Sequence, residues 1–212
     1  MGPSGVGKDT LIKDIIVKYG QLFERKKSYT TRPQKLDEKT PDNFHFVTVA
    51  EFEKMVANDD FVEYRQKLGG HWYGTAKAEL QRIISTGKIP IIEVDVQGAF
   101  SINAKAVEGN FLFIYPPSFQ ELRRRIGNRI ETEQEFKIRI SDAIKQLELA
   151  NSSVLFTNRL VNDKLEDAIS QFDTLIEALY FQEIKNIKMA KVRSESRTGS
   201  RASKESKEKE AK

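Results

Sequence analysis

The residues best suited to chemistry stand at the start of the chain, where Gly2-Pro3-Ser4-Gly5-Val6-Gly7-Lys8 has the spacing of a phosphate-binding loop. Glycines let successive backbone N–H groups converge on phosphate oxygens, and a lysine ammonium reaches the outer phosphates. Residues 10–19 carry apolar side chains at helical spacing and are followed by Gly20. A generic glycine-rich turn is the alternative, but this loop-then-helix context favours a phosphate site.

Two further groups of residues suit phosphoryl-transfer chemistry. Asp95 ends the apolar run 91–95, and the carboxyl end of a strand is where α/β sheets bind ligands and where a magnesium-side carboxylate stands. Alternatively, Asp95 caps the next helix. The second group is the arginine set Arg123, Arg124, Arg125, Arg129 and Arg139. Arg125 and Arg129 share a helix face and suit a clamp on a transferring phosphoryl group, although on spacing alone a solvated, salt-bridged surface is the better explanation.

Strands that alternate with helices must position these groups. The expected strands lie at 44–49, 61–66, 71–73, 89–96, 111–115 and 159–161. The expected helices lie at 10–19, 52–56, 76–86, 119–125, 133–150 and 165–181. This order predicts an α/β fold, in which a parallel sheet is flanked by helices and a small strand-rich subdomain is inserted at 27–86.

Composition narrows the chemistry further. The 212 residues, 39% of them hydrophobic, suit one domain with inserted subdomains. The chain has no cysteine and two histidines, which excludes disulfides and thiolate metal sites and gives no sign of a zinc centre. No apolar run reaches membrane-spanning length and no signal sequence precedes the loop, so we expect a cytoplasmic protein with no membrane partner.

The net charge of +4 comes from the end of the chain. Residues 187–212 hold nine basic and four acidic side chains, a net charge of +5, and the other residues sum to −1. Almost nothing apolar follows Lys188, so we expect residues 187–212 to form a disordered basic tail that acts as a solubilising segment. Weak, salt-sensitive contact with nucleic acid or an acidic partner is the alternative, and we expect no specific recognition there.

Six short motifs together resemble those of guanylate kinases. They are Gly2-Pro3-Ser4-Gly5-Val6-Gly7-Lys8, Thr30-Thr31-Arg32-Pro33, His45-Phe46-Val47, Tyr73-Gly74-Thr75, Asp95-Val96-Gln97-Gly98-Ala99 and Pro116-Pro117-Ser118. The resemblance covers about residues 1–183 and implies a P-loop NTPase-type fold and an enzyme that phosphorylates GMP with ATP and Mg²⁺, giving GDP and ADP. It also implies three parts: a nucleotide-binding core at 1–26, 87–117 and 140–186, a GMP-binding subdomain at 27–86, and a helical lid at 118–139.

The resemblance assigns roles to individual residues. The residues that would bind ATP are Gly2, Pro3, Ser4, Gly5, Val6, Gly7, Lys8, Asp9 and Thr10; of these, Asp9 and Thr10, with Asp95, would lie near magnesium. The residues that would bind GMP are Ser28, Arg32, Lys35, Phe44, Glu63, Tyr73, Thr75 and Glu93. Among them, Glu63 and Glu93 would accept hydrogen bonds from guanine N1 and N2, which adenine cannot supply in the same pattern, and Ser28 and Thr75 would lie at guanine O6. The catalytic residues would be Lys8, Asp95, Arg125, Arg129 and Arg139.

Three positions depart from the usual family pattern. Asp9 replaces a serine or threonine, Lys35 an arginine and Phe44 a tyrosine. We expect weaker GMP binding, because a lysine lacks the bidentate fork of arginine and phenylalanine lacks a hydroxyl donor. Family members also carry a buried strand before Gly2, and we expect this first core strand to be missing from the sequence.

Three classes of function remain open on the sequence. An active guanylate kinase is favoured. A related small-molecule kinase of the ribose 1,5-bisphosphate type also tends to have Gly-Lys-Asp in its loop, and a non-catalytic guanylate-kinase-like binding module usually lacks the loop lysine. We expect a monomer or a homodimer whose small-molecule partners are ATP and GMP.

Overall fold

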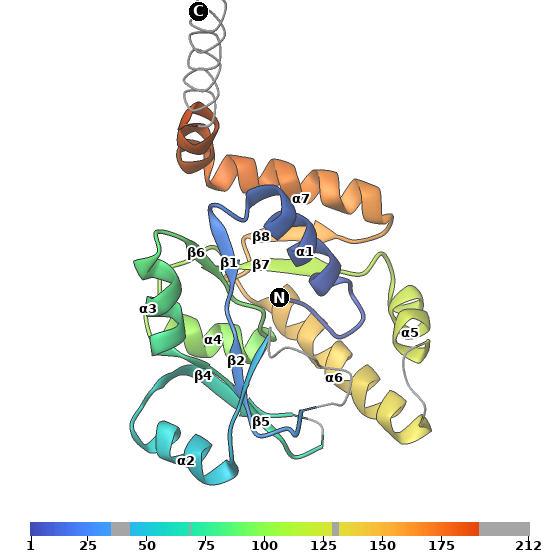
Figure 1. The fold of residues 1–212 in the computed structure, drawn as a ribbon. Helices are drawn as coiled ribbons and strands as arrows, with labels where there is room; N and C mark the ends of the chain where they lie inside the picture. Colours follow the sequence, from blue (N-terminus) through green and yellow to red (C-terminus); the bar gives the residue numbers. More distant parts are fainter. Residues whose placement is uncertain (35–42, 68, 129–131, 191–212) are drawn as a thin grey trace, which may run out of the picture. The chain divides into compact units, whose positions relative to one another are not determined.

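The structure is a computed structural model that describes residues 1–34, 43–67, 69–128 and 132–190 (Figure 1). The chain divides into two compact units, residues 1–172 and 173–212. The first unit is an α/β fold with parallel strands in its core. The fold class expected from the sequence is therefore confirmed.

Two pairs of parallel strands form the core. They are β1 (Phe23–Arg25) with β6 (Ile89–Ile91), and β7 (Leu112–Tyr115) with β8 (Asn158–Val161). Among the described residues, no hydrogen-bonded ladder joins β6 to β7, and no strand precedes the first helix. Met1 instead extends the second pair: its amino group donates to the carbonyl oxygen of Leu112 at 2.7 Å, and its own carbonyl accepts from the amide of Ile114 at 2.9 Å.

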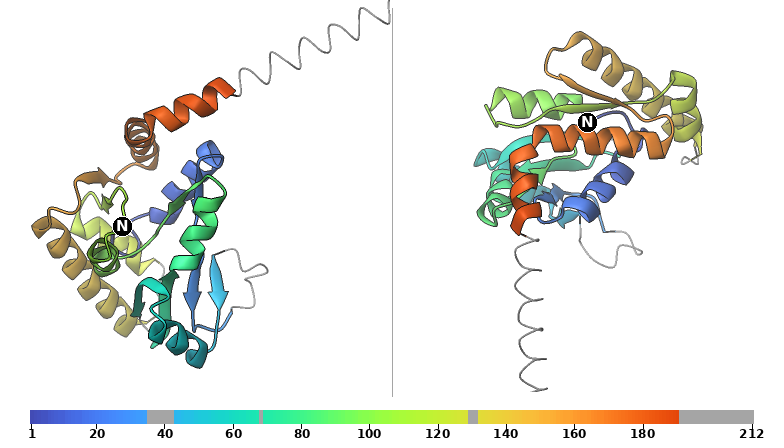
Figure 2. Two further views of the ribbon diagram at one scale, coloured as in Figure 1. Left: turned by 90° about the vertical axis from the view of Figure 1, so that its left-hand side faces the viewer. Right: turned by 90° about the horizontal axis from the view of Figure 1, so that it is seen from above.

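A separate four-stranded sheet occupies the inserted region. Its order is β3 (Phe44–Phe46), β2 (Ser28–Thr30), β5 (Trp72–Ala76) and β4 (Phe61–Gln66), and only β2 and β3 run parallel. Helix α2 (Val49–Ala57) begins with a capping box between Thr48 and Glu51. Its buried Phe52 stacks on Phe61 of β4 with the ring centroids 4.6 Å apart. This aromatic contact gives the inserted sheet its own small core. Figure 2 shows the ribbon of the chain from two further directions.

The structure describes six more helices with assigned bounds. They are α1 (Lys8–Tyr19), α3 (Lys77–Ser85), α4 (Val96–Ala104), α5 (Phe119–Gly127), α6 (Glu133–Ser152) and α7 (Leu165–Leu179). The main hydrophobic cluster joins Phe113 of β7 and Phe156, whose rings lie 5.5 Å apart, to Val96 and Ala99 of α4 and Ala150 of α6. This cluster holds α4 and α6 in place, and both helices border the site described below.

The second unit contains the end of α7 and a further helical stretch at 181–190. Within it, the Nζ atom of Lys188 lies 3.0 Å from a carboxylate oxygen of Glu177. Residues 187–190, which the sequence assigned to the tail, are thus helical, and residues 191–212 lie outside the described residues, where disorder stays a prediction. None of the described helices is both long and apolar enough to cross a membrane.

Candidate active site

A cavity of about 570 Å³ opens in the first unit, where the glycine-rich loop, the end of β6, the inserted sheet and α6 meet. Its lining residues are Gly2, Ser4, Lys8, Arg25, Lys26, Ser28, Asn43, Phe44, Arg65, Gln66, Lys67, Tyr73, Glu93, Val94, Asp95, Ile138, Arg139, Asp142 and Gln146. Most of these side chains are charged or polar. The cavity therefore suits a ligand that carries charge and many hydrogen-bonding groups.

The lysine of the glycine-rich loop is hydrogen-bonded to carbonyl oxygens of the same loop. The ammonium of Lys8 donates to the carbonyl oxygens of Gly2 at 2.7 Å and Pro3 at 2.9 Å. Burial lowers the pKa of Lys8, although the nearby Glu93 carboxylate opposes that shift. Gly5 and Gly7 have φ angles of 83° and 96°, in the region that favours glycine, so the loop needs both residues to reach the start of α1.

Asn162, directly after β8, supports this loop through a side-chain hydrogen bond. Its side chain is buried, and the Nδ2 atom donates to the carbonyl oxygen of Val6 at 2.8 Å. The backbone amide of Asn162 donates to Tyr115 at 2.8 Å and ties the loop support to β7. A Cβ atom on Gly7 would lie 2.2 Å from Nδ2 of Asn162, so the glycine leaves room for the asparagine. Sequence reasoning missed this residue, because an asparagine after a strand carries no local signal of a contact 156 positions away.

The aspartate after the loop lysine faces two cations rather than the cavity. Asp9 and Thr10 are exposed in the first turn of α1 and are absent from the lining residues. Partial burial raises the pKa of Asp9, but hydrogen bonds from Lys13 at 2.9 Å and Arg25 at 2.6 Å outweigh it and hold the pKa below its usual value. Arg25 also pairs with Glu93. Arg25 therefore links the start of α1 to the carboxylate that follows β6.

Four of the predicted GMP-binding residues line the cavity: Ser28, Phe44, Tyr73 and Glu93. Glu63 and Thr75 are buried beside it, on the paired strands β4 and β5, and the Thr75 hydroxyl donates to Glu63 at 2.5 Å. The other Glu63 oxygen faces the first turn of α4, where a Cβ on Gly98 would lie 3.2 Å from it.

Arg32 lies against two aromatic rings of β3. Its guanidinium carbon is 5.2 Å from the ring centre of Phe44 and 5.3 Å from that of Phe46, and one nitrogen donates to the carbonyl of Pro33 at 2.8 Å. The ring of Phe44 also meets that of Tyr73 edge-on at 6.1 Å. Phe44 thus positions Arg32 by a cation–π contact, a role that does not need the hydroxyl of a tyrosine. Lys35 lies outside the described residues.

Asp95 caps a helix and also lies at the cavity. It caps α4, because its Oδ1 atom accepts from the amide of Gly98 at 2.9 Å, and it also lines the cavity. Its other oxygen pairs with Arg65 of β4, whose buried Nε atom has no hydrogen-bond partner. In the part of the chain that the structure describes, no group of three or more histidine, cysteine, aspartate or glutamate side chains could hold a metal ion.

The structure separates the predicted catalytic arginines. Arg139 of α6 lines the cavity, where it donates to the Ser4 hydroxyl at 3.2 Å and pairs with Glu135. Arg125 of α5 does not line it, since its guanidinium bonds to Glu121 and to the carbonyl oxygens of Asn162 and Asp163. Arg129 lies outside the described residues. Of the predicted catalytic arginines that the structure describes, Arg139 is therefore the one that lines the cavity.

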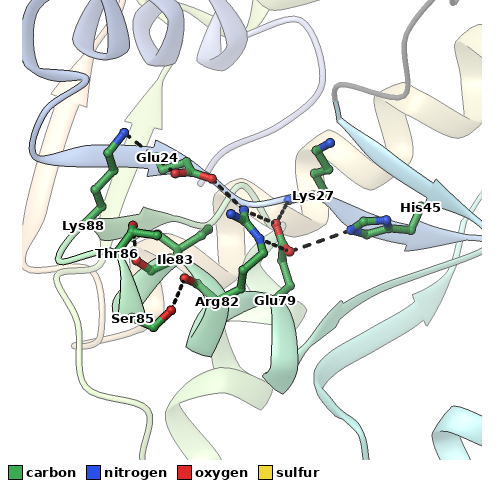
Figure 3. A network of polar contacts seen from close by, with 9 residues as sticks. All are labelled: Glu24, Lys27, His45, Glu79, Arg82, Ile83, Ser85, Thr86 and Lys88. Carbon is green, nitrogen blue, oxygen red and sulfur yellow. Dashed lines mark hydrogen bonds and ion pairs between the residues drawn. The ribbon is translucent and has the colours of Figure 1, made fainter.

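A buried carboxylate, Glu79, holds the segment between β1 and β2 in a network of polar contacts (Figure 3). Lys26 of this segment lines the cavity. Glu79 of α3 accepts from the backbone amide of Lys27 at 2.9 Å and from Arg82 at 2.9 Å. Arg82 also donates to Glu24 of β1 at 2.6 Å, and the His45 ring lies 3.8 Å from Glu79. Burial raises the pKa of Glu79, but these hydrogen bonds outweigh it and hold the pKa below its usual value. The network joins α3 to β1, to β3 and to the segment between β1 and β2.

Three lining residues with side-chain roles were also missed by sequence reasoning: Arg25, Lys26 and Arg65. Arg25 and Lys26 belong to the basic run 25–27, and such a run is ordinarily a solvated surface. Arg65 lies two positions after Glu63 along β4, and this spacing was the available signal that both side chains point to one face of the strand.

Comparison with known proteins places this chain in a family. A family model described as guanylate kinase matches residues 1–179. The chain is 36% identical to the guanylate kinase of Clostridium perfringens over 178 residues, which cover 84% of this chain and 80% of that protein. It is 34% identical to the guanylate kinase of Schizosaccharomyces pombe, with coverage of 82% and 86%. The crystal structure of guanylate kinase from Anaplasma phagocytophilum matches with a TM-score of 0.59 at 23% identity, covering 84% of this chain and 81% of that one, which supports the fold. The chain belongs to the guanylate kinase family.

Proposed function

We propose that this chain transfers the γ-phosphoryl group of ATP to GMP in the cavity described above. In this reaction an anionic oxygen of the GMP phosphate bonds to the γ-phosphorus as the bond between that phosphorus and the bridging oxygen of ATP breaks, which releases ADP and GDP. The observation that carries the proposal is that Lys8, Ser4 and Arg139 share one cavity with Ser28, Phe44, Tyr73 and Glu93, within a member of the guanylate kinase family.

At the ATP end, we assign the phosphates to the loop from Gly2 to Lys8 and the start of α1. The Lys8 ammonium already lies against two neutral carbonyl oxygens, and charged phosphate oxygens are stronger acceptors, so they would draw it away. The backbone amides of Gly5, Val6 and Gly7 and the positive end of the α1 dipole would add donors for the same oxygens. Asp9 and Thr10 belong to this end through the position of their backbone.

At the GMP end, we assign guanine to the wall that carries Ser28 and Glu93, with Glu63 and Thr75 behind it. Carboxylates would accept from guanine N1 and N2, which adenine lacks as donors in that pattern. The GMP phosphate would meet Arg32, Lys35 and Tyr73. Phe44 contributes by positioning Arg32, so its missing hydroxyl costs less affinity than the loss of a direct contact would.

Between the two ends, arginines would neutralise the charge that develops on the transferred group. Arg139 is in place at Ser4, and Arg125 and Arg129 are assigned to the same task from α5 and the segment after it. Mg²⁺ fits a site of this kind, because it keeps several waters and takes one or two carboxylates together with phosphate oxygens. Asp95, which lines the cavity, would supply that carboxylate, and the ion when bound would offset phosphate charge. Asp9 fits less well, because two cations already occupy its carboxylate.

The division into parts follows from the same assignment. We propose a core of residues 1–26, 87–117 and 140–186, a GMP-binding subdomain of 27–86 and a lid of 118–139. We also propose that the protein acts in the cytoplasm as a monomer or homodimer.

A coupled assay of ADP release tests the proposed function. With ATP and Mg²⁺, we expect turnover of GMP and little with AMP or ribose 1,5-bisphosphate. Lys8→Met should lower kcat by at least about a hundredfold, as expected when a charge that stabilises the transition state is removed. Lys18→Met is the matched control, because Lys18 lies on the same helix, pairs with Asp14 at 2.8 Å and is absent from the residues that line the cavity. Turnover of ribose 1,5-bisphosphate without turnover of GMP would contradict the proposal.

A further inference from the structure

A lysine ammonium is buried in the cavity wall beside Ser28. Lys26 follows β1, is only 5% exposed and lines the cavity. Its Nζ atom donates to the hydroxyl oxygen of Ser28 at 2.5 Å. The charged groups that face it are the carboxylates of Glu63 and Glu93 and the cations of Lys67 and Arg25. Burial is the main cause that lowers the pKa of Lys26, to about 8, so the amine is still mostly protonated at neutral pH.

A buried ammonium needs acceptors. Its three N–H groups lose their water on burial, and a charged donor without a partner costs several kcal/mol. Among the described residues, the hydroxyl of Ser28 is the hydrogen-bond acceptor that the structure gives it. Two donors therefore remain for a ligand in the cavity, and the ligand atom that suits them is an acceptor with negative partial charge.

We propose that Lys26 determines specificity by donating a charged hydrogen bond to the O6 carbonyl oxygen of guanine, next to Ser28. The inference rests on the proposed function, which brings guanine to this wall. A 6-oxopurine presents an acceptor to Lys26, whereas the 6-amino group of adenine presents a donor that would face an ammonium. The carboxylates Glu63 and Glu93 lie close enough to bias the charge of Lys26, so one cluster offers both the cation for O6 and the acceptors for N1 and N2.

The test is calorimetric binding of three nucleotides to the full chain and to Lys26→Met. GMP and inosine monophosphate both carry O6, whereas 6-thio-GMP keeps N1–H and the 2-amino group but replaces O6 with sulfur, a weak acceptor. A hydrogen bond to a charged donor contributes about 1.5–3 kcal/mol. We therefore expect Lys26→Met to weaken GMP and inosine monophosphate about tenfold or more, and 6-thio-GMP by less than about threefold.

Two further variants serve as controls for position and for charge. Lys27→Met removes the neighbouring lysine, which does not line the cavity, and should leave all three affinities within about twofold. Lys26→Arg keeps the charge and should retain most of the preference for GMP over 6-thio-GMP. Equal weakening of all three nucleotides by Lys26→Met would overturn the inference, because it would place Lys26 at the phosphate or in a purely structural role. If the unmodified chain binds none of the three nucleotides, the proposed function fails, and the inference about Lys26 fails with it. If the unmodified chain binds GMP and only the inference is wrong, Lys26→Met will instead weaken all three nucleotides equally.

Discussion

At the scale of single residues, the site is governed by how charges are paired in the cavity and at its border. Asp9 is balanced by Arg25 and Lys13, and Asp95 is paired with Arg65. Lys26, which is buried, and Lys8, which is partly buried, are different, because their hydrogen bonds go to neutral oxygens. The charge of Lys26 is therefore a cost to the folded state that a ligand can offset.

This cost predicts how stability depends on pH. The pKa of Lys26 falls from 10.5 in the unfolded chain to about 8 in the folded protein, so between these pH values the unfolded state binds more protons and the free energy of unfolding rises with pH. The rise attributable to Lys26 is about 3 kcal/mol across this window. Urea unfolding of the native chain and of Lys26→Met, at pH 7.5 and pH 10.5 as approximate end points, should show that the variant lacks this increment. Parallel pH profiles for the two proteins would contradict the assignment.

At the scale of elements, the segment from β1 to β2 depends on α3. Glu79 closes the network that ties the Lys27 amide, Arg82 and Glu24 together, and its side chain is 4% exposed. This arrangement explains how Arg25 and Lys26, two members of the basic run 25–27, are held at the wall of a cavity rather than in solvent.

Loss of this carboxylate should weaken the whole first unit. Glu79→Ala leaves the partly buried Lys27 amide without its acceptor and removes one partner of Arg82, so we expect the free energy of unfolding to fall by about 1–3 kcal/mol. The measurement is urea unfolding followed by circular dichroism, with Glu53→Ala on the exposed face of α2 as the control. If both variants lose the same small amount, the network is not a stabilising element.

The same scale shows how far the sequence could predict the structure. Apolar periodicity located α1, α6, β4 and β7 to within a few residues. The family resemblance assigned Ser28, Phe44, Tyr73 and Glu93 to one binding site, and all four line the cavity. Strands β1 and β2 were missed, because each has three residues and the basic run lies between them and hides the alternation. The strand expected at 89–96 ends at Ile91, because among the described residues it pairs with β1 alone, over three residues. Side-chain contacts across the fold, such as that of Asn162 with the loop, have no local signal.

At the scale of the whole molecule, the loop, the inserted sheet and α6 reach the same cavity from segments far apart in the chain. A ligand that contacts all of them links elements that otherwise share few contacts. Ligand binding should therefore stabilise the first unit as a whole rather than one part of it.

This coupling predicts a thermal shift. At a GMP concentration of 100 times Kd, binding should add about 2.7 kcal/mol to the free energy of unfolding, which raises Tm by roughly 5–10 °C for a domain of this size. Differential scanning calorimetry with GMP and with AMP measures the shift, and we expect little change with AMP. An equal shift with both nucleotides would show that the guanine-selective wall is not formed as proposed.

The pairing of Gly7 with Asn162 also limits how this sequence can evolve. The side-chain nitrogen of Asn162 occupies the space where any other residue at position 7 would place its Cβ atom. A substitution at position 7 is then blocked twice, by the backbone angle and by the asparagine, and shortening the asparagine would remove only the second obstacle while leaving the Val6 carbonyl without its donor. A single substitution at either position is therefore disfavoured. We expect relatives of this chain that keep one of the two residues to keep the other, although the residues stand at opposite ends of the first unit's sequence.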